Sequence, residues 1–206
     1  FNMDYTPYAI ARDSLISNMC KKHNVDVIIE HDYYLNVPGS VVNSSGNVYQ
    51  KFTPFYNVSK KNKVIKPKTI GHISFAYKKL KNMITLDEAM KKFVDSASID
   101  NSFLNGGRSH ALDQMHLAKK NVSDYIKIHD DLSKSTSLLS AYIKFGCVSI
   151  REVYWDFKEK VGLNNGIIEQ LLWREFYFYL VYYLPQILTK GEPQHEKFAF
   201  IDWKNN

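Results

Sequence analysis

The chain has 206 residues, of which 45% are apolar and 14% aromatic, a composition typical of a folded globular protein rather than a disordered one. Its 27 basic and 21 acidic residues give a formal charge of +6, which favours polyanionic partners without identifying one. The chain shows no secretory signal and no apolar run of membrane-spanning length, and its two distant cysteines, Cys20 and Cys147, are typical of free thiols in a reducing compartment. We therefore expect an intracellular protein, cytoplasmic or nuclear, that is neither secreted nor inserted in a membrane.

The first part of the chain is predicted to be half of an α/β layer. Thr6 and Pro7 resemble a helix cap and a first helical residue, and a helix with one buried apolar stripe is expected to follow. The run VDVIIE, residues 25–30, is rich in β-branched residues and predicts a buried strand. Residues 31–57 are interpreted as loop-rich, with turns at the Pro-Gly and Ser-Gly pairs. The predicted stripe consists of Ala11, Leu15, Ile16, Met19 and Cys20.

From about Val58 to Leu80 the composition changes, because lysines greatly outnumber acids. This stretch is interpreted as a solvated connection between domains, and contact of its lysines with phosphates is the alternative.

From residue 85 onward the chain is predicted to be helical. Capping boxes at Thr85-x-x-Glu88 and Ser149-x-x-Glu152 each open a helix. Three further helices are predicted: residues 109–120, residues 137–145 with Ser137 as the cap and Gly146 as the end, and residues 167–184 before Pro185.

These elements predict an α/β (Rossmann-like) portion followed by an all-α portion, both incomplete. The expected boundaries are 1–57 for the first, 58–84 for the basic connection and 85–206 for the second. The chain begins with Phe-Asn and ends after IDWKNN, and neither end is typical of a domain boundary. We therefore expect a fragment of a longer fold.

A hydroxyl cluster precedes one of the predicted helices. Thr136, Ser137 and Ser140 would lie at a helix N-terminus, where free amides and the helix dipole favour an anion such as phosphate. The alternative is that Ser137 only caps its own helix, and the residues alone favour this simpler interpretation.

The last predicted helix, EQLLWREFYFYLVYYLP over residues 169–185, carries rings on two faces. Gln170, Trp173 and Tyr177 lie on one face beside Arg174, an arrangement suited to stacking on nucleobases or a flavin. The alternative is a central core helix whose arginine pairs with an acid such as Glu175 or Asp156, and the spacing leaves both open. The other face carries Ile168, Leu171, Leu172, Phe176, Tyr179 and Tyr183.

Hydrolase and metalloenzyme functions have little support. The sequence contains no Gly-rich nucleotide loop, no metal-ligand cluster and no convincing nucleophile. Its scattered histidines are interpreted as structural or solvated: His72, His110, His116, His129 and His195.

Two stretches, TSLLSAYIKFGCVSIREVYW and QLLWREFYFYL, strongly resemble the flavin-binding domain of the photolyase/cryptochrome family. They match its Thr-Ser-x-Leu-Ser, Tyr-x-x-x-Gly, Ser-x-Arg and Leu-x-Trp-Arg-Glu-Phe patterns at appropriate separations. Upstream, FNMDYTPYAIARD and YQKFTPF look like the later half of the family's α/β antenna domain, and GGRSHAL lies where the family enters its helical domain.

The resemblance implies FAD as cofactor and UV-damaged DNA as partner. The residues that it assigns to FAD are Tyr125, Thr136, Ser137, Leu138, Leu139, Ser140, Gln170 and Arg174. Those that it assigns to the flipped-out lesion are Gln170, Trp173, Arg174 and Tyr177, with Trp173 as a stacking wall. No residue of the chain is assigned a certain catalytic role. A second antenna chromophore of folate or deazaflavin type, and a second chain or segment that completes the fold, are left open.

The activity implied is that of a deoxyribodipyrimidine photolyase, a lyase in which excited reduced FAD lends one electron to a pyrimidine dimer and recovers it after the bonds break. Gln170 departs from the pattern, since cyclobutane-dimer photolyases usually carry Glu there and Gln is more like (6-4) photolyases and animal cryptochromes. The lesion type therefore stays open. The alternatives are a cryptochrome-like light receptor without repair activity, or the inactive product of an interrupted gene.

Overall fold

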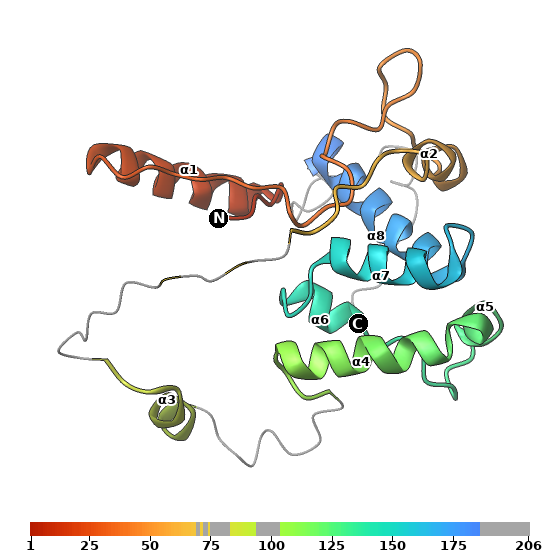
Figure 1. The fold of residues 1–206 in the computed structure, drawn as a ribbon. Helices are drawn as coiled ribbons and strands as arrows, with labels where there is room; N and C mark the ends of the chain where they lie inside the picture. Colours follow the sequence, from red (N-terminus) through yellow and green to blue (C-terminus); the bar gives the residue numbers. More distant parts are fainter. Residues whose placement is uncertain (69–70, 72–73, 75–82, 94–103, 186–206) are drawn as a thin grey trace, which may run out of the picture.

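The computed structural model describes residues 1–68, 71, 74, 83–93 and 104–185, and the regular elements of this part are helices (Figure 1). Helices α4 to α8 pack together and α2 lies against α8, whereas α1 and α3 lie apart from this group. The elements are α1 (Pro7–Lys22), α2 (Phe52–Ser59), α3 (Leu86–Phe93), α4 (Arg108–Lys120), the 3-10 helix η2 (Val122–Asp124), α5 (Tyr125–Ile128), α6 (Ser140–Lys144), α7 (Ile150–Val161) and α8 (Gly166–Tyr183).

Local capping patterns in the sequence correctly predict where two of the helices begin. At the start of α7 the Ser149 hydroxyl accepts from the amides of residues 151 and 152, and the Glu152 carboxylate accepts from the Ser149 amide at 2.9 Å. The same reciprocal pair, Thr85 and Glu88, opens α3. Both predicted capping boxes are confirmed, and each satisfies amides that have no partner inside the helix. The predicted helix before Pro185 is confirmed as α8.

Helix α8 is the centre of the core. Its apolar face packs on α7 toward the N-terminal end and on α2 toward the C-terminal end. The predicted apolar face is confirmed, because five of its residues are at most 6% exposed and the sixth, Tyr183, is half-buried. The five are Ile168, Leu171, Leu172, Phe176 and Tyr179.

The predicted strand at residues 25–30 is not formed. This segment is extended, but it is joined to the start of the chain by a single parallel bridge between Asn2 and Glu30. Val25 and Ile28 are 55% and 72% exposed, so the expected burial is also wrong. A lone pair of extended segments is at best marginally stable, because a sheet needs several strands and a covered face. The α/β architecture predicted for residues 1–57 is therefore not confirmed.

Helix α1 forms as predicted, with the Thr6 hydroxyl accepting from the Ala9 amide, but its apolar stripe is not buried. Leu15 is 70% exposed and Met19 is 63% exposed. Periodicity correctly predicted the helix, whereas burial depends on a covering layer that the described part of the chain does not supply to this face.

Helix α2 lies inside the stretch that we interpreted as loop. Its proline, Pro54, sits in the first turn, where the amide needs no helical partner, so it does not break the helix. Phe55 is 1% exposed and packs against Phe176 and Tyr179 at ring-centroid distances of 5.3 and 5.2 Å. The helix is stabilised by this tertiary contact, which no local pattern in the sequence predicts.

The helix predicted from Ser137 begins three residues later, at Ser140, and Ser137 does not cap it. Leu138 has φ 53°, in the left-handed region, which is incompatible with a right-handed helix and turns residues 136–139 into a loop. The end is as predicted, since Gly146 adopts φ 69°.

The predicted basic connection, residues 58–84, is described only in part, and the boundaries of the predicted domains stay a prediction. Lys66 lies within it and contacts α7 through an ion pair with Glu159 at 2.6 Å. Among the described helices, none is long and apolar enough to cross a membrane.

Candidate functional site

A cavity of about 510 Å³ lies between α8, the neighbouring helices α5 to α7 and the loop before α6. Its size is in the range of small-molecule sites. All eight residues that the resemblance assigns to a cofactor line it: Tyr125, Thr136, Ser137, Leu138, Leu139, Ser140, Gln170 and Arg174. The fold therefore brings together residues that are up to 49 positions apart in the sequence, from Tyr125 to Arg174.

The loop over residues 136–139 forms one wall of this pocket. The strained left-handed conformation of Leu138 is of the kind that clusters at ligand sites. Gln114 of α4 braces the loop, because its side-chain amide donates to the Ser137 carbonyl at 2.9 Å. Thr136, Ser137 and Ser140 all line the cavity.

Arg174 forms the opposite wall. Its guanidinium lies 4.3 and 4.6 Å from the ring centroids of Tyr33 and Phe178, two rings that contact each other edge to face, and Nη1 donates to the Tyr33 carbonyl at 3.1 Å. Nη2 is buried and has no hydrogen-bond partner in the described part of the chain. A buried donor without an acceptor is costly, so a ligand oxygen would satisfy it.

The alternative interpretation, in which Arg174 pairs with an acid such as Glu175 or Asp156, is not what the structure shows. Asp156 instead accepts from Lys119 at 2.8 Å. Glu175 is fully buried and accepts from the main-chain amides of Leu35 and Asn36 at 2.9 and 2.6 Å. Burial raises the pKa of Glu175 to about 7, although the hydrogen bonds from Asn36 and Leu35 and the charge of Arg174 act in the opposite direction.

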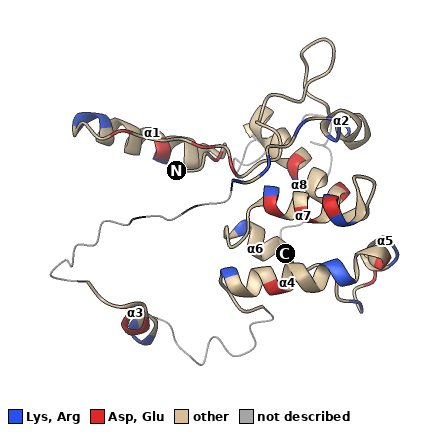
Figure 2. Ribbon diagram, in the orientation of Figure 1, with Lys and Arg blue, Asp and Glu red and all other residues tan. Residues whose placement is uncertain are grey.

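The pocket has a positive character. Arg174 and Lys144 both line it, and its described lining contains no acid. Figure 2 shows that basic and acidic positions are instead interspersed along α4 and α7. A positive, partly apolar cavity suits a ligand with anionic and aromatic parts. Burial, with a smaller contribution from Asp130, raises the pKa of Tyr125, so this wall residue stays neutral at physiological pH.

Trp173 and Tyr177 lie outside the lining of this pocket. The Trp173 ring stacks on Phe52 of α2, with centroids 3.6 Å apart, and lies 5.8 Å from Tyr177, which is 59% exposed. Gln170, exposed one turn earlier on α8, lines the pocket. The four residues predicted for the lesion are thus divided: Gln170 and Arg174 belong to the pocket, and Trp173 and Tyr177 form an outer aromatic stack with Phe52.

The histidines do not form a site in the described residues. His129 stacks on Tyr125 at 5.6 Å, His116 lies at a shallow hollow between α4 and α7, and no group of three potential metal ligands occurs in the described ranges. His72 and His195 lie outside those ranges.

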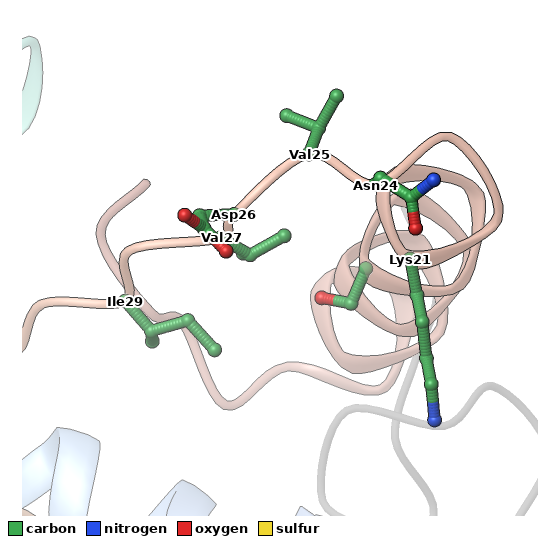
Figure 3. A pocket seen from close by; sticks show the side chains of 7 residues that line it. Lys21, Asn24, Val25, Asp26, Val27 and Ile29 are labelled. Carbon is green, nitrogen blue, oxygen red and sulfur yellow. The ribbon is translucent and has the colours of Figure 1, made fainter.

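A second hollow, of about 490 Å³, lies where the end of α1 meets residues 25–29 (Figure 3). In Figure 3 the side chains of Lys21 and Val25 point in opposite directions, so they do not converge on a common ligand.

Sequence reasoning did not assign seven of the lining residues to the pocket, among them Tyr33, Lys144 and Phe178. Phe178 lies four residues after Arg174, the spacing that places two side chains on one helix face, so helical periodicity could have found it. Tyr33 lies in a segment without regular structure, and no local signal points to it.

Comparison with known proteins finds related photolyases and cryptochromes. The profile of the family described as DNA photolyase matches residues 1–71. The deoxyribodipyrimidine photo-lyase of Buchnera aphidicola subsp. Baizongia pistaciae is 31% identical over all of this chain and 45% of the relative, and cryptochrome-1 of Aedes aegypti is 24% identical over 86% of this chain and 39% of the relative. A crystal structure of an archaeal photolyase from Sulfolobus tokodaii, described with two FAD molecules, superposes with a TM-score of 0.75 at 29% identity, covering all of this chain and 42% of its own.

The fold and the site together define the class of structure: a bundle of helices around a positively charged pocket of small-molecule size. Within it, the chain is similar to members of the photolyase/cryptochrome family. It spans under half of the length of these relatives.

Proposed function

We propose that this chain is the part of an FAD-dependent DNA photolyase that holds one side of the flavin cofactor and one wall of the lesion site. The observation that carries this is the pocket beside α8, which gathers the eight residues expected to contact FAD. Similarity to members of the family supports the reaction class, the light-driven repair of pyrimidine dimers in UV-damaged DNA.

The residues present fit FAD. The unpartnered Nη2 of Arg174 offers a buried donor to a phosphate oxygen, and Lys144 adds a second positive charge. The hydroxyls of Thr136, Ser137 and Ser140 supply further donors on the opposite wall. Ring and aliphatic side chains of the lining suit the flat parts of the cofactor. A second chromophore is not assigned to residues of this chain.

When bound, FAD supplies the light absorption and the electron that the reaction requires. The chain's own contribution is to bind and orient: Arg174 and the 136–140 loop would fix the phosphates, while Gln170 would offer an amide donor and an acceptor at the pocket's edge. Trp173 and Tyr177, together with Phe52, would provide a stacking surface for the displaced bases.

A cryptochrome-like light receptor is the second candidate. Gln170 is consistent with it as well as with a (6-4) photolyase, because in both an amide takes the place of the carboxylate that cyclobutane-dimer photolyases usually carry. Both candidates need FAD, and only the photolyase also needs to repair DNA.

The test uses the chain co-expressed with the flanking regions that its longer relatives possess. We expect the purified protein to bind FAD and, when illuminated, to remove pyrimidine dimers from an oligonucleotide. In Trp173→Ala we expect FAD to be retained and lesion binding to be lost, with Trp155→Phe as a control on a helix away from the stack. FAD binding without repair would assign the receptor function, and failure to bind FAD would refute both candidates.

A further inference from the structure

Each residue of the segment 31–37, HDYYLNV, makes a hydrogen bond to a side chain of α7 or α8. Three main-chain carbonyls, two main-chain amides and one carboxylate of residues 31–36 bond to three helix side chains, and the Val37 carbonyl bonds to a fourth. The four helix residues are Arg151, Arg174, Glu175 and Tyr179. A segment without regular structure normally leaves its polar backbone groups to water, so a hydrogen bond from every residue to the helices needs a reason.

Arg151 of α7 holds the first half of the segment. Its guanidinium donates from Nε to the Tyr34 carbonyl, from Nη1 to the Asp32 carboxylate and from Nη2 to the His31 carbonyl, each at 3.1 Å. The side chain is only 14% exposed. A lysine could not reproduce this contact, because the three donors point in the fixed directions of a planar fork.

Glu175 of α8 holds the second half. Both of its carboxylate oxygens accept main-chain amides, those of Leu35 and Asn36, in a fully buried position. Tyr179, one turn later, donates its hydroxyl to the Val37 carbonyl. The segment cannot slide along α8 without breaking these bonds together.

Tyr33, at the middle of the segment, is the point where this fastening reaches the pocket. Its ring lines the cavity and covers one face of the Arg174 guanidinium, and its carbonyl accepts from Arg174 Nη1. Arg151 holds Asp32 and Tyr34, the two residues that flank Tyr33. The orientation of Arg174 in the pocket therefore depends on Arg151, and on Glu175 through residues 35 and 36. Neither Arg151 nor Glu175 lines the pocket.

We propose that Arg151 and Glu175 are positioning residues for the cofactor pocket: by fastening residues 31–37 to α7 and α8, they hold Tyr33 and Arg174 in the arrangement that leaves Arg174 Nη2 free for an anionic ligand. The identity of that ligand as FAD rests on the proposed function, whereas the control of Arg174 by Arg151 does not.

The decisive variant is Arg151→Lys, and its matched control is Arg108→Lys. Arg108 also makes three hydrogen bonds from its guanidinium, to the Cys147 carbonyl and to both oxygens of Glu152, but it joins α4 to α7 and does not touch the segment. Two readouts are measured in the completed protein: the FAD dissociation constant by fluorescence titration, and the NMR signal of the Arg174 guanidinium, assigned with Arg174→Lys. Contact with two aromatic rings, those of Tyr33 and Phe178, gives that signal a distinctive position.

We expect Arg151→Lys to raise the FAD dissociation constant about tenfold or more and to move the Arg174 signal toward that of a free arginine, while Arg108→Lys leaves both unchanged. An unchanged Arg174 signal in Arg151→Lys, or equal shifts in both variants, overturns the proposal. If Arg151→Lys does not fold, Asp32→Ala removes one of the three contacts and must move the signal in the same direction. If the wild type binds no FAD, the proposed function fails, and the Arg174 signal still decides the positioning role.

Discussion

Glu175→Gln provides a quantitative test of the buried contact between α8 and residues 35–36. A glutamine keeps one oxygen acceptor, so its amide nitrogen would face a main-chain amide and leave that buried donor unsatisfied. The expected loss is about 1–3 kcal/mol in the free energy of unfolding. This loss should be clearest at pH 5, where the wild-type carboxyl is protonated and both of its oxygens can still accept.

The pH dependence follows from the raised pKa of Glu175. Its folded-state pKa is about 7 against an ordinary 4.5, so the folded chain holds a proton that the unfolded chain has released. At about 1.4 kcal/mol per pKa unit, this contributes roughly 3 kcal/mol of stability below pH 4.5, which is lost as the pH rises through 7. The stability advantage of wild type over Glu175→Gln should therefore fall by roughly 2–3 kcal/mol from pH 5 to pH 8, so that it vanishes or reverses.

Urea unfolding followed by near-ultraviolet circular dichroism measures this difference at each pH. Glu159→Gln is the control: Lys66 lowers the pKa of Glu159, whose titration therefore lies below this window. A difference between wild type and Glu175→Gln that does not change from pH 5 to pH 8 would refute the reasoning.

Three other substitutions test the packing around the site. Gly166→Ala should destabilise the chain by about 1–3 kcal/mol in urea unfolding, because a Cβ there would lie 2.8 Å from Ile126 and 2.9 Å from the pocket residue Tyr125. Wild-type stability of this variant would contradict the close approach. Ser149→Ala should cost about 1 kcal/mol by loss of the α7 cap, and Ser149→Thr, which keeps the hydroxyl, should restore most of it. Phe52→Ala should expose the stacked face of Trp173 and shift tryptophan emission to longer wavelength, and an unchanged spectrum would argue against the stack.

Local signals in the sequence predicted most helices of the second half, because capping boxes and apolar periodicity act within one or two turns. Ser149 with Glu152, and the apolar face of α8, are examples. The same logic failed at Ser137, where the left-handed Leu138 delays the helix to Ser140. Nothing in the residue types of this loop distinguishes a cap from a pocket wall.

The parts that could not be predicted depend on contacts distant in sequence. Tyr33 and its neighbour Tyr34 are held by hydrogen bonds from Arg174 and Arg151, both more than 100 positions away, and α2 is stabilised by packing on α8. Glu175 was considered only as a partner for Arg174, whereas its carboxylate turns to the main chain of residues 35–36. In residues 25–30, β-branched composition predicted a strand, but a strand also requires neighbours, and a single bridge is what this segment has.

The central claim is that the pocket beside α8 is a flavin site, and the most direct measurement is a titration of the completed protein with FAD, followed by flavin fluorescence. We expect saturable binding with one FAD at this pocket, weakened about tenfold or more in Arg174→Lys and unchanged in Lys21→Met, at the hollow beside α1. Absence of saturable FAD binding, or equal binding by wild type and Arg174→Lys, would contradict the account.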